Sequence, residues 1–112
     1  MNLRGKIWFE LDGRHVFGKG RAELLEAVER EGSIQAAARR MGMSYRRAWS
    51  LLKSTEKRCG EPLVETSRGG SDGGGARVTE LGRRLLDAYR HVETDLEDML
   101  GGKQDEMDWP DV

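Results

Sequence analysis

Residues 32–60 read GSIQAAARRMGMSYRRAWSLLKSTEKRCG, and this stretch decides the fold. A short Ala-rich helical pattern over residues 34–41 is followed by a glycine-containing turn and a longer basic pattern over residues 45–59. Ser33 and Ser44 stand immediately before the two patterns, where a serine hydroxyl can accept a hydrogen bond from a free backbone N–H group. The alanines combine high helix propensity with small size, which lets another helix approach closely. The stretch therefore predicts a helix-turn-helix.

The second helix of this motif is basic. Against the single acid Glu56 it carries five cationic side chains, Arg46, Arg47, Lys53, Lys57 and Arg58. Binding to DNA phosphates needs such a cationic surface, and the start of the second helix is the part that enters the major groove in these motifs. A solvated, charged helix face is the alternative interpretation. We favour DNA contact because the charge coincides with the turn motif.

The residues before the motif predict a β-hairpin and a further helix. The segments KIWFEL (6–11) and RHVF (14–17) flank Asp12-Gly13, a dipeptide that favours the positive φ angles of a two-residue hairpin turn. Residues 21–31 then place leucine and valine side chains on one stripe at helical spacing. Gly32 follows at the position where a helix commonly ends.

The basic helix has an inward face and an outward face. Ala48, Leu52, Thr55 and Cys59 fall at steps of four, three and four, so they share the face that points toward the core. Trp49 leaves two interpretations open, namely burial against the hairpin or partial exposure beside DNA.

The residues after the motif predict a wing. PLVETSR (62–68) and ARVT (76–79) have the character of two short strands, and GGSDGGG (69–75) between them suits a flexible hairpin tip. Arg68 and Arg77 at its base are candidate phosphate contacts. The rival interpretation, a nucleotide-binding glycine loop, fails because no GK[ST] ends the glycine tract.

We therefore predict DNA contacts at the helix starts, along the basic helix and at the base of the wing. An arginine among them can pair with a guanine edge or bind a phosphate, and both roles stay open. The predicted residues are Ser33, Gln35, Ser44, Tyr45, Arg46, Arg47, Trp49, Ser50, Lys53, Arg68 and Arg77.

From residue 80 onward, apolar side chains repeat at alternating steps of four and three. A helix of about 20 residues, about 30 Å at 1.5 Å per residue, would extend beyond a core this small and bind a second copy of the chain. Packing against its own domain is the alternative, and we expect it for the first turns. The predicted dimer contacts are Leu85, Ala88, Tyr89, Val92, Leu96 and Met99. Acids on the polar face argue against membrane attachment.

Composition predicts one domain over residues 1–100, which includes the dimerisation helix at 80–100, followed by an acidic, disordered tail at 101–112. The net charge of −1 hides a dipole, since residues 93–112 hold eight of the 20 acids and only one of the 19 Lys and Arg residues. Residues 1–92 therefore carry a balance of +6. Trp109 in the tail is either a handle for a partner or inert.

Several classes of protein are excluded by what the chain lacks. One cysteine, no signal-peptide pattern and no apolar run long enough to span a bilayer predict a cytoplasmic protein. His15, His91 and Cys59 lie in different predicted elements, so we expect neither a metal site, nor a cofactor, nor an enzyme.

These motifs together resemble the N-terminal DNA-binding domain of the ModE family, the molybdate-responsive bacterial transcription regulators, and more broadly the LysR-type winged helix. The resemblance spans about residues 3–96 and lies in GSIQAAARRMGMSYRRAWSLL and EPLVETSRGGSDGGGARVTELGRRLL. It implies a homodimer that is held by the long helix, assisted by the N-terminal hairpin, and reads an inverted repeat in a promoter. Full-length members carry molybdate-binding domains after this region, and the present chain has no strands left to build one. We therefore expect no molybdate ligand in it.

The predicted fold class is mainly α with small β-hairpins, a winged helix-turn-helix with an N-terminal hairpin and a long C-terminal helix. The predicted function is binding of double-stranded DNA as a transcription regulator, with a link to molybdenum-related genes. The alternative is a winged helix that serves protein interaction or DNA architecture without reading sequence.

Overall fold

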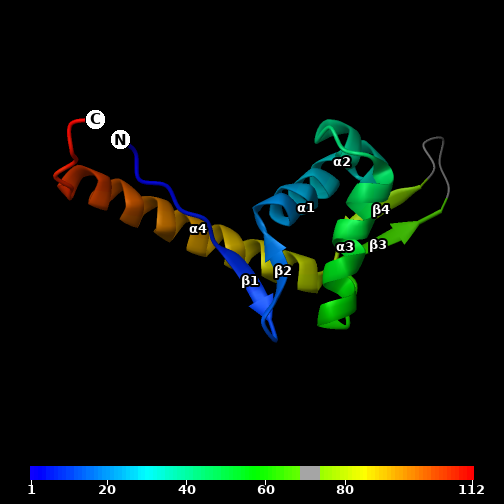
Figure 1. Cartoon of the computed structure of the whole chain (residues 1–112). Helices are drawn as coiled ribbons and strands as arrows, with labels where there is room; N and C mark the ends of the chain where they lie inside the picture. The colour runs from blue at the N-terminus through cyan, green and yellow to red at the C-terminus, as the bar shows by residue number, and fades with distance from the viewer. Residues whose placement is uncertain (69–73) are drawn as a thin grey trace.

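The computed structural model of the chain describes residues 1–68 and 74–112, and the description below concerns these residues. In chain order they form β1 (Trp8–Leu11), β2 (Arg14–Gly18), α1 (Lys19–Glu31), α2 (Ile34–Arg40), α3 (Tyr45–Cys59), β3 (Val64–Ser67), β4 (Gly75–Val78) and α4 (Glu80–Glu106). The first three helices and the β3–β4 hairpin form a head, from which α4 extends away with the N-terminal segment beside it (Figure 1). The predicted fold class is confirmed.

The N-terminal hairpin forms where the sequence predicts it. β1 and β2 pair antiparallel, and Asp12 and Gly13 between them have φ angles of 53° and 76°. α1 begins at Lys19, two residues before its predicted start, because Gly18 adopts the extended conformation of an N-cap. A glycine is tolerated in the following turn, since the first N–H groups of a helix have no intrahelical partner.

The helix-turn-helix is closed by the expected local contacts. Ser33 Oγ accepts a hydrogen bond from the Ala36 backbone N–H at 3.0 Å, and Ser44 Oγ accepts one from Arg47 at 3.1 Å. Gly42 supplies the turn with a φ of 70°, a conformation that costs glycine little. Both predicted N-caps are confirmed.

The core lies where α1, α2, α3 and the start of α4 meet, and an aromatic cluster joins α4 to the N-terminal hairpin. The Tyr89 ring meets those of Phe9 and Phe17 edge-on, each with its centroid 5.9 Å away. Tyr89 is only 2% exposed. It therefore belongs to the core of its own chain and not to the exposed stripe on which the sequence placed it. Cys59, predicted to be core, is half-buried.

The wing is the β3–β4 hairpin, paired antiparallel from Val64↔Val78 to Ser67↔Gly75. A hydrogen bond from Ala76 N to Gly32 O at 2.8 Å ties β4 to the end of α1, and one from Thr79 N to Leu63 O at 2.9 Å continues the pairing at the base of the wing. Most of the glycine tract predicted to be a flexible tip, residues 69–73, lies outside the described residues.

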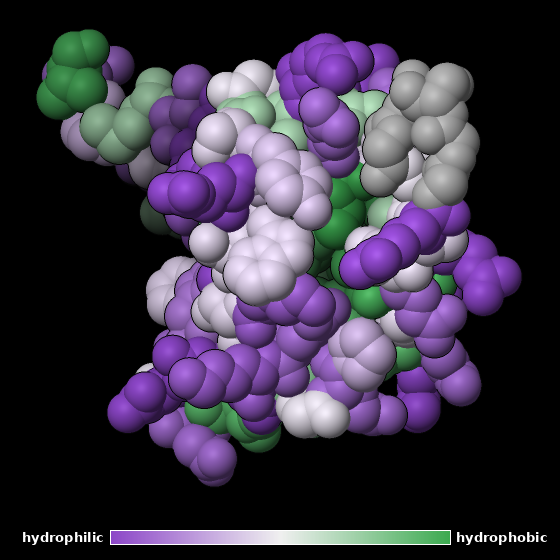
Figure 2. Space-filling view, turned by 90° about the vertical axis from the view of Figure 1, so that its right-hand side faces the viewer, coloured by the Kyte–Doolittle hydropathy of each residue, from purple (hydrophilic) through white to green (hydrophobic). Residues whose placement is uncertain are grey.

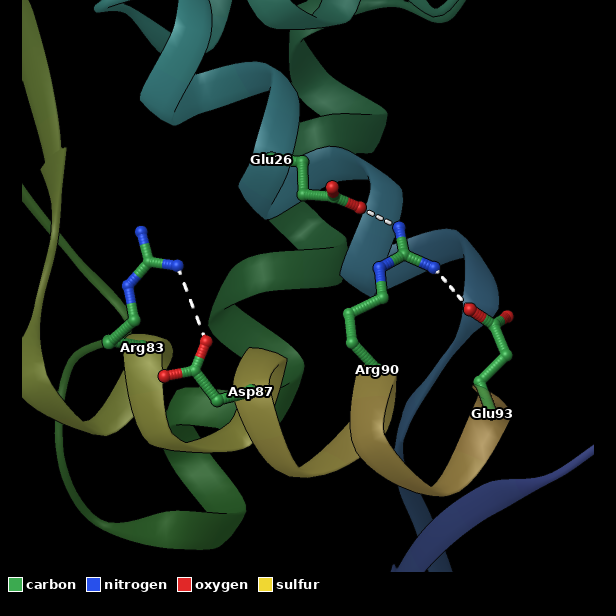
Figure 3. A network of polar contacts seen from close by, with 5 residues as sticks. All are labelled: Glu26, Arg83, Asp87, Arg90 and Glu93. Carbon is green, nitrogen blue, oxygen red and sulfur yellow. Dashed lines mark hydrogen bonds and ion pairs between the residues drawn. The ribbon is translucent and has the colours of Figure 1, made fainter. Parts of the chain in front are cut away.

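Arginines of α4 fix this helix against α1. Arg90 pairs with Glu26 of α1 and, at 2.6 Å, with Glu93 one turn along α4 (Figure 3). Arg83 likewise pairs with Glu29 of α1 and, at 3.5 Å, with Asp87. These partly exposed pairs orient the helix more than they stabilise it.

α4 continues through residues 101–106, so the predicted end of the helix at residue 100 is wrong. Two glycines in this part weaken the helix, but the side chain of Gln104 donates a hydrogen bond to Met1 O at 2.8 Å and ties the last turns to the N-terminal segment. This contact joins residues from opposite ends of the chain, which a local pattern does not reveal. No helix among the described residues is long and apolar enough to cross a membrane.

Candidate nucleic-acid interface

A groove of about 430 Å³ lies between α3, the start of α2 and the wing. Apolar side chains of Ile34, Leu52, Val64 and Ala76 line its depth. In Figure 2 the corresponding hollow shows green, apolar atoms at its bottom, between paler and purple side chains at the rim. The start of α2 contributes to one wall because the turn of the motif sets α2 across the start of α3.

The structure gathers most of the predicted contact residues around this groove. Six of them line it directly: Ser33, Gln35, Tyr45, Trp49, Lys53 and Arg68. Arg46, Arg47 and Ser50 are exposed elsewhere on α3. The hydroxyls of Ser33 and Ser44 are occupied as helix caps, which leaves them less free for a ligand.

Arg77 is the one predicted wing residue that the structure places away from the groove. Side chains alternate between the two faces of a strand, and on β4 the groove side is taken by Ala76. Arg77 lies on the other face beside its cross-strand partner Glu65, at 3.4 Å.

Trp49 is 44% exposed, which answers the question that the sequence left open. The ring is not packed into the N-terminal hairpin. Instead the Lys53 ammonium lies over it, 5.4 Å from the ring centroid, in a cation–π contact. Lys53 is in turn held by Glu56, whose Oε1 lies 2.9 Å from Nζ.

Glu56 is a positioning residue that the sequence analysis missed. Its carboxylate is nearly buried and accepts hydrogen bonds from the backbone N–H groups of Leu63, at 2.7 Å, and Val64, at 3.4 Å. The same side chain therefore joins α3 to the first strand of the wing and pairs with Lys53, which lines the groove. The sequence contains one indication of this role, since Glu56 is the only acid in an otherwise basic helix.

The opposite flank of α3 is also cationic. Arg21 of α1 donates from Nε to the Leu51 carbonyl at 3.1 Å, and burial, followed by the charges of Arg58 and Arg47, lowers the pKa of its guanidinium. Positive charge thus continues around α3 from the groove to the side that faces the hairpin. Such a field attracts a polyanion over the whole exposed surface of the helix.

α4 presents a second exposed surface. Val92 is 42% exposed and Met99 is 49% exposed, and Ala88 is exposed on the same side of the helix, whereas Leu85 packs against the core and Leu96 lies beside Gly5 of the N-terminal segment. Leu86 is instead buried in the core, and Tyr89 is buried against Phe9 and Phe17 of the N-terminal hairpin. The stripe therefore has an exposed apolar half and a buried half.

A helix-turn-helix whose second helix is followed by a β-hairpin wing defines the class, a winged helix-turn-helix domain of a regulatory protein. The chain belongs to the lysR family of bacterial regulatory helix-turn-helix proteins, whose family model matches residues 20–83.

Curated relatives place it beside the ModE proteins, as its motifs predict. It is 42% identical over 80 residues to the molybdenum transport protein ModE of Azotobacter vinelandii, an alignment that covers 71% of this chain and 30% of the relative. It is 37% identical over 86 residues to the transcriptional regulator ModE of Haemophilus influenzae, which covers 77% of this chain and 34% of the relative. The chain thus spans about a third of the length of these relatives.

Solved structures agree on the fold. ArgP from Mycobacterium tuberculosis matches with a TM-score of 0.56 and 25% identity, over 76% of this chain and 30% of that one. The CbnR DNA-binding domain in complex with DNA matches with a TM-score of 0.55 and 24% identity, over 75% of this chain and 90% of that one.

Proposed function

We propose that this chain binds double-stranded DNA as a transcription regulator and reads an inverted-repeat promoter site as a homodimer. The observation that carries the proposal is the groove between α3 and the wing, which gathers six of the residues predicted from sequence to contact DNA on one cationic face. In this arrangement α3 enters the major groove and the wing lies along the adjacent backbone.

The residues divide between two kinds of contact. Arg46 and Arg47 lie in the first turn of α3, the part of the helix from which a side chain can meet base edges or the flanking phosphates. Lys53 and Arg68 lie on opposite walls of the groove, where each can meet a phosphate on its own side.

The dimer is proposed to form through the exposed apolar side of α4, with Val92 and Met99 at its centre. Isolated apolar residues on a surface are common, but a continuous stripe on an extended helix favours a second helix as its partner. Two copies joined in this way would present their α3 helices to half-sites separated by one helical turn, about 10 bp, or by a multiple of it.

The genes that the protein regulates are proposed to concern molybdenum, because the curated relatives are ModE proteins. We assign no molybdate ligand to the residues of this chain.

Sequencing of genomic fragments that stay bound to the purified protein at near-physiological salt tests the proposal. We expect one inverted repeat, recovered near genes of molybdenum uptake or use. Random fragments would indicate an architectural role, and no recovered DNA would favour the protein-interaction alternative.

Arginine variants then test the assignment of α3. Arg46→Ala and Arg47→Ala are expected to weaken binding to the recovered site by about 1–3 kcal/mol each if they read bases, and to relax the sequence preference. Arg30→Ala, which removes the same charge from α1 outside the groove, is the matched control. A loss that is equal for all three variants would contradict the assignment.

A further inference from the structure

Two aromatic side chains on the groove side of α3 are exposed in a place where the proposed function otherwise calls for polar groups. Tyr45 is 51% exposed and Trp49 is 44% exposed. They lie four residues apart and so on the same side of the helix, and both line the groove. They are the only large apolar or aromatic side chains that the described parts of α3 and the wing leave exposed.

The Trp49 ring is held in place. Lys53 covers one face, Glu56 fixes Lys53, and the backbone N–H groups of the wing fix Glu56. Glu56 is nearly buried, whereas the Lys53 side chain is 44% exposed, and its contact favours one orientation of the indole before any ligand arrives. A pre-oriented ring contributes more to selectivity than a mobile one, because less conformational freedom is lost on binding.

Part of the surface next to the rings is apolar as well. Ile34 and Leu52 lie at the bottom of the groove beside them, so the aromatic rim and the apolar depth form one continuous patch. Polar groups such as Gln35 and Lys53 line the same groove, but on a base edge the faces of the two rings themselves can meet only an apolar group. In the major groove, the apolar group that distinguishes one base pair from the others is the 5-methyl group of thymine.

We infer that Tyr45 and Trp49 select thymine at the positions that they face, through contact with its 5-methyl group. The inference rests on the proposed function, because it requires α3 to enter the major groove. It assigns the methyl-reading role to the wing side of α3 and leaves hydrogen-bonded readout to Arg46 and Arg47 on its outer side.

The test replaces thymine with deoxyuridine, one position at a time, in a duplex that carries the recovered site. This change removes the methyl group from the DNA and leaves the protein and all base pairing intact. At one or more positions per half-site we expect affinity to fall by about fourfold, the effect of losing one buried methyl-sized group. The same substitutions are then measured with Trp49→Ala, Tyr45→Ala and the control Ser50→Ala.

The outcomes are distinct. A deoxyuridine effect that disappears in Trp49→Ala or Tyr45→Ala and persists in Ser50→Ala supports the inference. A protein that binds its site without any deoxyuridine effect, or one whose effect survives in both aromatic variants, overturns the inference and leaves the proposed function standing. Absence of selective binding to any duplex overturns the proposed function itself, and the inference with it.

Discussion

α3 and the outer half of α4, residues 93–106, carry net charges of opposite sign, and only the charge of α3 is proposed to bind DNA. α3 holds five cations, and its only acid, Glu56, is nearly buried and bonded to the wing. Residues 93–106 of α4 hold six acids and a single lysine. Exposed apolar residues are found in both regions, as aromatic rings on the groove side of α3 and as aliphatic chains on α4.

The difference shows why net charge was a poor guide to this protein. A total of −1 averages a cationic face and an acidic arm that lie at opposite parts of an elongated molecule measuring 59 × 30 × 20 Å. At an ionic strength near 0.15 M, charges are screened over about 8 Å, so DNA at α3 would scarcely experience the far acids. Each region can therefore be altered separately.

The largest effect is expected from Val92→Asp. A carboxylate in the middle of the exposed stripe should prevent the α4 helices from pairing, which leaves one α3 per particle and lowers affinity for the full inverted repeat by about 10²–10⁴-fold. Thr94→Asp, which adds the same charge at an exposed position on the other side of α4, is the control. Sedimentation and DNA titration measure both effects, and an intact Val92→Asp dimer would contradict the assignment of the stripe.

Two tyrosines test which aromatic rings belong to the core. Tyr89→Ala removes a buried ring and should lower the free energy of unfolding by about 3–5 kcal/mol, the range for large aromatic side chains. Tyr45→Ala changes an exposed ring, so its effect should stay within about 0.5 kcal/mol. Denaturant titration at two protein concentrations measures the free energy of unfolding of both variants. If the loss at Tyr89 depended on concentration, the ring would belong to the dimer contact after all.

A smaller loss of stability is expected at Glu56. Glu56→Leu removes the acceptor and leaves the Leu63 backbone N–H unpaired, which should cost about 1–3 kcal/mol. Glu56→Gln retains an amide oxygen at the same place and should lose less, although it releases Lys53. Hydrogen exchange at the Leu63 amide, with Glu61→Gln as an exposed control, would report the change. Equal protection in all three variants would refute the anchoring role.

The smallest effect concerns alkaline pH. Burial, followed by the charges of Glu93 and Glu23, raises the pKa of Tyr89 above its ordinary value of 10.0. The unfolded chain therefore ionises this tyrosine at a lower pH than the folded chain does. The contribution of the protonated Tyr89 to the free energy of unfolding is therefore fully present below pH 10, and it is lost as the pH rises from 10 through the raised pKa. Tyr89→Phe should flatten that decline relative to the unaltered chain. Parallel curves for the variant and the unaltered chain would disprove the assignment.

The parts of the fold that could be predicted were set by local chemistry. Asp12-Gly13 forms the hairpin turn, and Ser33 and Ser44 cap their helices, because each of these contacts lies within a few residues of the side chain that makes it. The composition of α3 likewise indicated its exposed face.

The errors arose from contacts between distant parts of the chain. The apolar spacing along α4 could not separate the half of the stripe that meets Phe9 and Phe17 from the half that stays exposed. Gln104 stabilises the last turns of α4 through residues about a hundred positions away. Arg77 lies on the face away from the groove because side chains alternate along β4, and Glu56 joins α3 to the wing through the backbone of Leu63 and Val64, beyond the end of its own helix.

Gly82, near the start of α4, has a mechanical consequence. A Cβ at this position would lie 2.6 Å from Leu63 O and 2.8 Å from Val78 Cγ1, so any larger residue must push α4 away from the base of the wing. α4 is about 40 Å long at 1.5 Å per residue, and each degree of tilt at this pivot would shift its far end by about 0.7 Å. This glycine therefore sets the angle between α4 and the head, and in the proposed dimer its exchange for alanine would alter the distance between the two α3 helices.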